Sequence, residues 1–348
     1  MITNRAAFVQ SNRDIAMGET GMPAVGEHDV LVRIIYCGVC GSDVHFYEYG
    51  EPEFPDVYPF VLGHEFSGEV VEVGRKVTTH KVGDRVSVEP GIPCRVCAWC
   101  SSGKYNLCPY ITFLSAPRAF GAMRNYVAHP ASLCHLLPNN VSSLEGALIE
   151  PLAVGMNAVR NSGATVGNSV TILGAGCIGL VTLLSLRAAG VRDITVVDLH
   201  DIRLDKAKKL GAKNIVNASS TDAVAGVVDL HEGFGPDFVF ETAGSRITAA
   251  QTVFMTKRGG TVMIVGNVSG ETAFNFQKFT DKELQLKSVF RYRNIFPTAI
   301  AAVASGQVDI TDIVSNQYAF DDTQRAFEDS ISQKQTMVKA VVHIGAEG

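Results

Sequence analysis

Four cysteines are spaced closely enough to bind one metal ion. They are Cys94, Cys97, Cys100 and Cys108, in the pattern Cys-x2-Cys-x2-Cys-x7-Cys. Four thiolates in such a loop can surround a tetrahedral ion, and zinc prefers a sulfur shell of this kind. Because four protein ligands leave no coordination position open, the pattern predicts a structural zinc site and not a catalytic one.

A second set of residues that can bind a metal is dispersed along the chain. Cys40 opens the run Cys-Gly-Ser-Asp-Val-His, His64 and Glu65 lie in Gly-His-Glu-Phe-Ser-Gly, and Glu150 precedes a proline. Spacing alone does not unite them. A single histidine is more often a hydrogen-bonded core or surface group than a metal ligand, and a glutamate before proline is often a turn residue. The residues by themselves leave both interpretations open.

A glycine-rich turn separates a short apolar run, 170–173, from a stretch with helical character. In a G-x-G-x-x-G motif, the first glycine permits a tight turn, the second lets the backbone approach a pyrophosphate, and the third lets the helix pack on the strand. The phosphates then lie at a helix N-terminus, where free N–H groups and the dipole favour anions. The motif therefore predicts a dinucleotide site, with contacts from Gly174, Gly176, Ile178 and Gly179.

An acid ends the next predicted strand, at Asp198. We expect its carboxylate to accept hydrogen bonds from the adenosine ribose hydroxyls. A carboxylate there repels a 2′-phosphate, so the sequence favours NAD over NADP. Arg203, five residues later, also belongs to the candidate cofactor site. An arginine there can bind a 2′-phosphate and so favours NADP.

The elements that must position these residues change in kind near residue 165. The residues before ~150 read as β structure with many Gly and Pro breaks, with strands expected at 29–36, 69–73 and 85–88. Beyond residue 165, strands alternate with helices, which implies βαβ units and a parallel sheet. The later strands are expected at 170–173, 194–198, 237–241, 261–265, 286–290 and 338–343, and the helices at 178–189, 203–210 and 322–332.

Length and composition fit a globular protein of two domains. The chain has 348 residues, 46% of them hydrophobic and 19% charged, with a formal net charge of -5. That charge gives no electrostatic reason to expect nucleic acid or an anionic membrane as a partner. No apolar run reaches the ~20 residues that a membrane span needs, and we find no secretory signal. We therefore expect a cytoplasmic protein whose cysteines are metal ligands or small core residues.

Several motifs together resemble the medium-chain alcohol dehydrogenases. The pattern G-H-E-x2-G-x5-G-x2-V at 63–77 resembles their zinc signature, and the Cys-Gly-Ser-Asp-x-His run, the four-cysteine lobe and the glycine motif occur in that family's order. The resemblance covers essentially the whole chain. Within the family it is strongest to sorbitol (polyol, L-iditol) dehydrogenases, through 146–155 and 289–294. Glu150 stands where other alcohol dehydrogenases carry a cysteine ligand, and a glutamate there is typical of the polyol and threonine branches.

This resemblance implies a catalytic zinc bound by Cys40, His64 and Glu65, so that each chain would carry two zinc ions. It implies that Glu150 acts through zinc-bound water or ligates the metal directly. A glutamate in place of a thiolate makes the zinc harder, which suits a substrate with adjacent hydroxyls. The candidate catalytic residues, which would relay the substrate's proton, are Ser42, His45 and Glu150.

The resemblance also indicates which residues line the nicotinamide and the substrate. Sorbitol dehydrogenases often have tyrosine directly after the histidine that matches His45. This chain has Phe46 there and Tyr47 one position later, so that hydroxyl is missing or shifted. The candidate contacts are Val265, Gly266, Asn267, Val289, Phe290 and Arg291 for the cofactor, and Phe46, Phe113, Arg291 and Tyr292 for the substrate.

The fold that the resemblance implies is an α/β protein of two domains. Residues 1–155, completed by 293–348, would form a GroES-like β-barrel catalytic domain with the structural zinc lobe. Residues 156–292 would form a Rossmann domain, a doubly wound parallel sheet that binds NAD, with the active cleft between the domains. A homo-oligomer, tetramer or dimer, is also implied.

The predicted reaction is the NAD-linked oxidation of a secondary alcohol to a ketone, with a polyol oxidised at C2 as the expected substrate. Rival substrates are L-threonine, a sugar acid and a polyol phosphate. The phosphate would need extra cations, for which Arg118, Arg124 and Arg293 are candidates. A non-enzymatic NAD-binding protein of the crystallin kind should have lost its zinc ligands, and this chain retains all of them.

Overall fold

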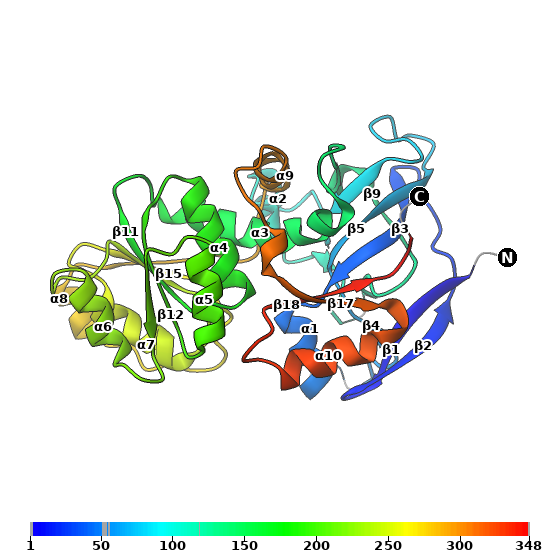
Figure 1. The fold of residues 1–348 in the computed structure, drawn as a ribbon. Coiled ribbons are helices and arrows are strands. Elements are labelled where there is room, and N and C mark those ends of the chain that lie inside the picture. Colours follow the sequence, from blue (N-terminus) through cyan, green and yellow to red (C-terminus); the bar gives the residue numbers. More distant parts are fainter. Residues whose placement is uncertain (1–2, 51–53, 55, 118, 347–348) are drawn as a thin grey trace. The chain divides into compact units, whose positions relative to one another are not determined.

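The computed structural model describes residues 3–50, 54, 56–117 and 119–346 (Figure 1). The chain divides into two compact units. Unit 1 comprises Met1–Glu150, Phe296–Ala304 and Val314–Gly348, and unit 2 comprises Pro151–Ile295 and Ser305–Ile313. The C-terminal segment therefore returns to the unit that the N-terminal segment begins.

Unit 1 contains a seven-stranded sheet centred on β3 (Asp29–Gly38). This strand is rich in β-branched residues and almost continuously buried, as expected for a strand covered on both faces. It pairs antiparallel with β5 (Glu65–Val73), β9 (Tyr126–Pro130) and β18 (Lys339–His343), and β3 and β18 are the blue and red strands that lie side by side in Figure 1. The sheet is completed by β6 (Arg85–Val88), β10 (Cys134–Leu136) and β17 (Val314–Ala319).

Smaller elements surround this sheet. A three-stranded sheet joins β2 (Asp14–Thr20), β1 (Asn4–Ser11) and β4 (Phe60–Val61), and β7 (Gly91–Ile92) pairs with β8 (Thr112–Phe113). The helices of unit 1 are α1 (Gly41–Tyr49), α2 (Ala98–Ser101), α9 (Phe296–Ala304) and α10 (Thr323–Ser332), with short turns η1 (Tyr105–Leu107), η2 (Ala131–Leu133) and η4 (Phe320–Asp322).

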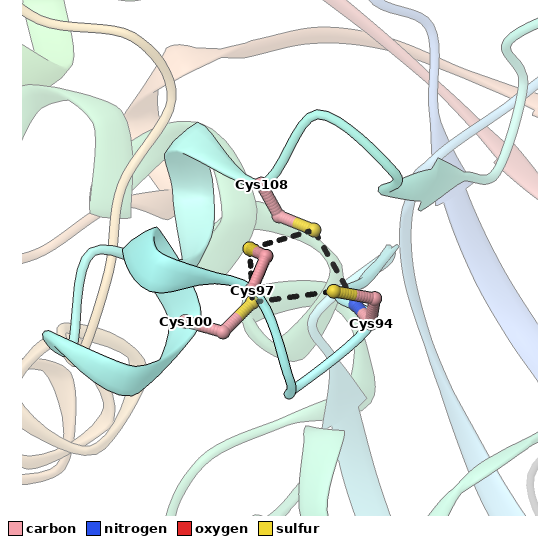
Figure 2. A group of neighbouring side chains, drawn as sticks. All are labelled: Cys94, Cys97, Cys100 and Cys108. Atoms are coloured by element: carbon pink, nitrogen blue, oxygen red, sulfur yellow. Dashed lines mark hydrogen bonds between the residues drawn. The ribbon is translucent and has the colours of Figure 1, made fainter.

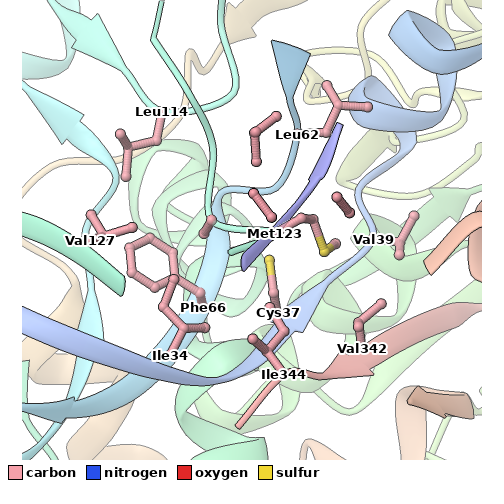
Figure 3. Close-up of a cluster of buried hydrophobic side chains, with 14 of the residues drawn as sticks. Ile34, Cys37, Val39, Leu62, Phe66, Leu114, Met123, Val127, Val342 and Ile344 are labelled. Carbon is pink, nitrogen blue, oxygen red and sulfur yellow. The ribbon is translucent and has the colours of Figure 1, made fainter. Parts of the chain in front are cut away.

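The hydrophobic core of unit 1, part of which is drawn in Figure 3, joins distant parts of the chain. Ile34, Phe66, Met123 and Val342 come from separate segments, and each is at most 1% exposed. Burying one such side chain contributes about 1.5–3 kcal/mol. Because β3 ends just before Cys40 and β5 begins at Glu65, this packing also fixes the backbone that carries the dispersed metal-binding residues.

Unit 2 contains a six-stranded sheet in the order β13-β12-β11-β14-β15-β16, and every pairing in it is parallel. The strand order reverses between β11 and β14, which is the point where a doubly wound sheet binds its ligand outside the carboxyl ends of the strands. The strands are β11 (Ser169–Leu173), β12 (Asp193–Asp198), β13 (Asn214–Asn217), β14 (Phe238–Glu241), β15 (Thr261–Ile264) and β16 (Gln285–Ser288). The helices are α4 (Cys177–Ala188), α5 (Asp201–Lys209), α6 (Ala223–Leu230), α7 (Arg246–Met255) and α8 (Phe276–Asp281), with the short turn η3 (Thr311–Ile313).

The predicted elements agree with the structure except at two places. The interpretation of Glu150 and its proline as a turn is wrong, because both lie inside α3 (Ser143–Ser162). A proline inside a helix loses a hydrogen bond at a cost of about 3 kcal/mol. Here Leu148, Ile149 and Leu152 are fully buried, and their burial offsets that loss. The strand expected to reach residue 290 is too long, since β16 ends at Ser288.

Two further observations concern the described residues as a whole. No helix that they form has both the length and the apolar character to cross a membrane. All eight cysteines lie in the described part of the chain, and none of them forms a disulfide.

Candidate active site and metal centres

The four clustered cysteines converge on one point (Figure 2). Cys97 caps the N-terminus of α2, Cys100 lies within α2, and Cys108 ends η1. The sulfur atoms are 3.5 Å apart for Cys97 and Cys100, 3.9 Å for Cys97 and Cys108, and 4.0 Å for Cys94 and Cys100. A tetrahedral zinc with Zn–S bonds of about 2.3 Å places its sulfurs about 3.8 Å apart. The lobe therefore fits one zinc bound by four thiolates.

The thiols of this lobe differ in how readily they ionise. Hydrogen bonding from the backbone of Val96 lowers the pKa of Cys94 to about 7. Desolvation raises the pKa of Cys100 to about 12, and its sulfur neighbours add to the rise. Four thiolates this close repel one another, so they ionise together only when a cation shares their charge. The electrostatics of the lobe thus also fit a bound dication.

Cys40, His64 and Glu65 form a second group, whose ligand atoms all lie within 4.8 Å of one another. The β3–β5 pairing brings them together, because Gly38 at the end of β3 faces Glu65 at the start of β5. His64 is 6% exposed and Glu65 is 1% exposed. One thiolate, one imidazole and one carboxylate make a donor set that suits zinc and leaves a position for a further ligand.

Asp43 connects these ligands, although the sequence analysis did not single it out. Its carboxylate is 2% exposed, and Oδ2 accepts a hydrogen bond from the backbone N–H of Cys40 at 3.3 Å. Oδ1 lies 3.2 Å from His64 Nδ1, off the line of an ideal hydrogen bond. A histidine whose Nδ1 faces a carboxylate presents its Nε2 to a metal. The position of Asp43 three residues after Cys40, at the start of a helix, is the signal that could have identified it.

The charges of this pair are set by burial and by each other. Burial raises the pKa of Asp43, but the charge of His64 and hydrogen bonds to the carboxylate lower it below the usual value overall. Burial lowers the pKa of His64, but Asp43 and Cys40 raise it well above the usual value overall. A metal that binds His64 must therefore displace a proton from the ring.

Glu65 has a buried cationic partner, Lys339. The Nζ atom lies 2.7 Å from Oε1 and 2.6 Å from Oε2 of Glu65, and it donates to the carbonyl oxygen of Val39 at 3.1 Å. Both charged side chains are 2% exposed. Lys339 begins β18, whose pairing with β3 brings the cation to the site. The two residues are 274 positions apart, and no spacing rule finds such a partner, so the sequence analysis missed it.

The three candidate catalytic residues lie on two helices. Ser42, on α1, donates a hydrogen bond to Cys40 Sγ at 3.3 Å. His45, on the same helix, is exposed and packs against Tyr49 with ring centroids 5.0 Å apart. Glu150, on α3, is 6% exposed and lies outside the group of converging ligand atoms that the described residues form around Cys40. Ser42 thus touches a candidate zinc ligand, and the roles of His45 and Glu150 stay predictions.

The two phenylalanines expected near the substrate lie in different surroundings. Phe113, on β8, places its ring centroid 5.3 Å from that of His64, beside the candidate zinc ligands. Phe46 is 7% exposed and packs in the core against Phe60, with centroids 5.2 Å apart. The predicted substrate contact of Phe46 is therefore not supported, because its ring is covered by other core residues.

Tyr47 does not supply the hydroxyl that Phe46 lacks. Its hydroxyl contacts Glu328 Oε1 at 2.7 Å and donates to the carbonyl oxygen of Arg13 at 2.9 Å. Burial raises the pKa of Tyr47, and the carboxylate of Glu328 raises it further. The helix turns this side chain toward α10, where its ring packs on Phe327. Of the two alternatives, a missing hydroxyl or one shifted to Tyr47, these contacts favour the missing one.

The glycine motif of unit 2 has the geometry that a dinucleotide turn needs. Gly174, directly after β11, has a φ of +102°, which L side chains rarely adopt. A Cβ on Gly179 would clash with the carbonyl oxygen of Gly174, so only glycine lets α4 approach β11 this closely. A Cβ on Gly176 would meet only Arg203, at 3.8 Å, and this open side lies at the N-terminus of α4. Ile178 is in the first turn of that helix.

Asp198, at the end of β12, braces this turn. Oδ2 accepts a hydrogen bond from the backbone N–H of Ala175 at 2.7 Å, and Oδ1 accepts from those of Leu199 and His200 at 2.8 and 3.0 Å. A carboxylate has about four acceptor positions, so one remains for a ribose hydroxyl. The structure therefore gives Asp198 a second role, and its contact with ribose stays a prediction.

The turn at 265–267 leaves the carboxyl end of β15 and is tied to the end of β14. The backbone N–H groups of Val265 and Gly266 both donate to the carbonyl oxygen of Glu241 at 2.9 Å, and Asn267 is exposed. Glu241 is fully buried and accepts a hydrogen bond from Thr248 Oγ1 at 2.7 Å. Burial raises its pKa. The main-chain carbonyl of this residue holds the turn that we expect to line the nicotinamide, and its carboxylate bonds to Thr248 of α7.

The stretch 289–292 follows β16 as an irregular segment. Val289 is half-buried, Phe290 is 54% exposed, and the guanidinium of Arg291 lies 4.7 Å from the centroid of the Phe290 ring. Arg291 has a φ of +54°, and the side chain of Asn157 donates to its carbonyl oxygen at 2.9 Å. Tyr292 is 3% exposed. Backbone strain of this kind clusters at functional sites, and the contacts of this segment with cofactor and substrate stay predictions.

Comparison with models of known protein families identifies the family to which the chain belongs. Residues 26–139 match the model of the alcohol dehydrogenase GroES-like domain, and residues 177–305 match that of the zinc-binding dehydrogenases. The chain belongs to the family of zinc-dependent alcohol dehydrogenases. The predicted fold, a GroES-like domain joined to a Rossmann domain, is confirmed.

Individual relatives narrow the class. The uncharacterized zinc-type alcohol dehydrogenase-like protein YdjJ of Escherichia coli (strain K12) is 42% identical over 98% of this chain and 99% of its own length. Sorbitol dehydrogenase of Bacillus subtilis (strain 168) is 36% identical over 97% of each chain. A crystal structure of an Escherichia coli oxidoreductase/dehydrogenase of unknown specificity superposes with a TM-score of 0.96, at 41% identity, over 99% of this chain and 100% of that chain. The predicted closeness to sorbitol dehydrogenases is confirmed, and the protein is a zinc-dependent, NAD-linked alcohol dehydrogenase.

The two metal-binding groups predict two zinc ions of unequal lability. Four thiolates enclose one ion, whereas the group around Cys40 leaves a position where a chelator can attack. A mild chelator should remove one zinc per chain and abolish activity while the melting temperature changes little. Zinc content, activity and melting temperature are measured on the same samples.

A matched variant tests the other site. Cys94→Ser should lower the melting temperature and leave kcat of the folded fraction close to that of the wild type. Full activity after loss of the zinc at Cys40, His64 and Glu65 would contradict this assignment, and so would a Cys94→Ser protein of unchanged stability that turns over no substrate.

The buried ion pair predicts a stability effect of Lys339→Met. Removing the cation leaves the Glu65 carboxylate unpaired in the core, so the free energy of unfolding of the zinc-free protein should fall by about 3–5 kcal/mol. Lys213→Met is the control, because its pair with Asp193 is exposed and contributes at most about 1 kcal/mol. Urea unfolding of both variants at neutral pH measures the difference. A Lys339→Met protein as stable as Lys213→Met would show that Glu65 does not depend on this cation.

Proposed function

We propose that this enzyme oxidises a polyol to a ketose with NAD, most readily at C2 of a five- or six-carbon sugar alcohol. The observation that carries the proposal is the donor set of Cys40, His64 and Glu65, which has a single thiolate. Glu150 stands where alcohol dehydrogenases outside the polyol and threonine branches carry a second cysteine. A zinc ion with fewer sulfur ligands is harder and accepts oxygen ligands more readily. A vicinal diol can offer such an ion its second hydroxyl.

In this reaction the protein's own groups prepare the site. A zinc ion held by Cys40, His64 and Glu65 would supply a Lewis acid for the hydroxyl and C–O bond of the substrate, and bound NAD would supply the hydride acceptor. Asp43 orients His64, and Lys339 compensates the charge of Glu65. Ser42 and His45 are three residues apart on α1 and so share a face of the helix. Because Ser42 contacts Cys40 and His45 is exposed, the two form a path for a proton from the site to water.

Substrate hydroxyls away from the reacting carbon are bound, in this proposal, by Arg291 and Tyr292. A polyol can use these two hydrogen-bonding groups and a simple alcohol cannot, and each hydrogen bond gained, at about 1 kcal/mol or more, favours the polyol by several-fold. Neither Phe46 nor Tyr47 offers a hydroxyl to the substrate. We therefore propose broad acceptance of C4 to C6 polyols rather than a strict preference for sorbitol.

The rival substrates have less support from the chain. A polyol phosphate needs cations beside the substrate. Of the three arginines considered, Arg118 lies outside the described residues, and Arg124 is a half-buried group of unit 1 whose pKa desolvation lowers to about 10. Arg293 is half-buried in unit 2. L-threonine and sugar acids remain comparison substrates in the assay below.

We also propose the assignment of roles to the two units. Unit 1 would be the catalytic domain and unit 2 the NAD-binding domain, in a cytoplasmic homo-oligomer, tetramer or dimer. The absence of disulfides among eight cysteines supports a reducing compartment. The exposure of Val96 and Tyr110 on the zinc lobe, 84% and 72%, supports a surface that another subunit covers.

The polyol proposal predicts a selective effect of Arg291→Ala. The variant should lose at least about tenfold in kcat/KM for sorbitol or xylitol, because it removes a hydrogen bond between a charged donor and a substrate hydroxyl. Such a bond contributes about 1.5–3 kcal/mol. It should lose far less for 2-propanol, which has no second hydroxyl. Arg293→Ala, a neighbouring arginine, is the matched control. The measurement is steady-state kinetics at saturating NAD, which also separates the effect from loss of a cofactor contact.

Two results would overturn the polyol proposal. One is a wild-type kcat/KM for 2-propanol that equals that for the best polyol. The other is turnover of L-threonine or a sugar acid but of no polyol.

Cofactor preference is predicted to depend on the charge of Asp198. Asp198→Asn keeps one acceptor oxygen, loses the bonds that the second oxygen accepts, and removes the charge that repels a 2′-phosphate, so the ratio of kcat/KM for NAD to that for NADP should fall. Asp198→Ala should lower the same ratio and, because it also loses the brace, reduce kcat/KM for both cofactors. Wild-type preference for NADP, or an unchanged ratio in Asp198→Asn, would refute this assignment.

A further inference from the structure

Ser115 has an unusual backbone beside the candidate catalytic zinc. Its φ is +70°, a left-handed conformation that L side chains rarely adopt. It follows Leu114, which is 6% exposed and drawn in the core in Figure 3, and it lies two residues after Phe113, whose ring packs against His64. A non-glycine residue in this conformation persists only where its surroundings hold it, and such residues cluster at functional sites.

The side chain of Ser115 joins two groups next to the zinc ligands. Its hydroxyl donates to Asp43 Oδ1 at 2.5 Å and accepts a hydrogen bond from the backbone N–H of Gly63 at 2.9 Å. The same Oδ1 lies 3.2 Å from His64 Nδ1. Gly63 directly precedes His64 and packs against the core, since a Cβ on it would lie 2.7 Å from Cys37 Sγ. One hydroxyl therefore braces both the carboxylate that faces His64 and the backbone that carries it.

We propose that Ser115 is a positioning residue for the catalytic zinc, which fixes Asp43 against His64 and thereby ties the segment of Phe113 to the metal ligand. This inference rests on the proposed zinc site at Cys40, His64 and Glu65. Partners that hold a ligating histidine typically change metal affinity by about 10–100-fold when they are lost. Ser115 contacts His64 only through Asp43. Loss of its hydroxyl should therefore lower the zinc affinity by a factor at the lower end of that range.

The backbone strain allows an experiment that separates this role from a structural one. Ser115→Ala removes the hydroxyl and keeps the strain, whereas Ser115→Gly removes both, because glycine adopts a positive φ readily. A structural role predicts that zinc retention follows stability, so Ser115→Gly should be rescued relative to Ser115→Ala. Our proposal predicts that both variants release the catalytic zinc about tenfold faster than the wild type, whatever their melting temperatures.

The measurement is the rate of zinc transfer from the purified full-length enzyme to a chromogenic chelator, with the melting temperature recorded for each protein. The slow release from the four-cysteine lobe is an internal control and should be unchanged in both variants. Glu232→Gly is the matched control, because it relieves a left-handed residue of φ +57° on the exposed surface of unit 2 and should leave both rates unchanged.

The outcomes distinguish this inference from the proposed site itself. One outcome is a fast phase of zinc release that has the same rate, within twofold, in the wild type and in Ser115→Ala. That result overturns the role of Ser115 and leaves the zinc assignment at Cys40, His64 and Glu65 intact. A fast phase that survives in Cys40→Ser overturns the zinc assignment and this inference with it. Restoration of slow release in Ser115→Gly but not in Ser115→Ala shows that strain, not the hydroxyl, sets the rate, and also overturns it.

Discussion

Burial of charged groups in an apolar core is the constraint on which unit 1 depends. Asp43 and Glu65 are at most 2% exposed, and a carboxylate at that depth without partners destabilises the fold by several kcal/mol. Lys339 compensates Glu65, while backbone N–H groups and the Ser115 hydroxyl surround Asp43. These partners come from β18, from the turn before α1 and from the segment after β8. The register of the central sheet is therefore as much a part of the site as the ligands.

Unit 2 satisfies a different constraint, which is the close packing of α4 on β11 around a turn whose backbone stays open at Gly176, as a dinucleotide site requires. A turn of this kind, without bulky side chains, needs support from its neighbours. The support comes from the carboxyl ends of the two strands beside β11. The carboxylate of Asp198, ending β12, holds the glycine turn itself, and the main-chain carbonyl of Glu241, ending β14, holds the turn after β15. These hydrogen bonds keep the edge of the sheet in shape before any cofactor binds.

The two metal-binding groups differ in what holds them. The four-cysteine lobe is exposed and has short helices and little core of its own. We therefore expect metal binding, and not hydrophobic packing, to stabilise its conformation. Cys40, His64 and Glu65 are already fixed by β3, β5 and the ion pair with Lys339. A preorganised group of this kind tolerates an open coordination position, which is what chemistry at the metal requires. This difference supports our proposal that one zinc ion stabilises the fold and the other carries the chemistry.

Local spacing determined much of this protein from the sequence alone. The cysteines of the lobe lie on adjacent short turns, the glycine motif lies within one strand–turn–helix, and alternation of strands and helices fixed the parallel sheet, because each of these depends on neighbouring residues. Spacing could not unite Cys40 with His64 and Glu65; there, only resemblance to a family led to a site. Tertiary structure alone decided the partners Asp43, Ser115 and Lys339, the helical setting of Glu150, and the turning of Phe46 and Tyr47 away from a substrate role. Those features depend on contacts between segments far apart in the sequence, such as β18 with β5 for Lys339 and Glu65, or α1 with α10 for Tyr47 and Phe327, and long-range packing of that kind leaves no periodic trace along the chain.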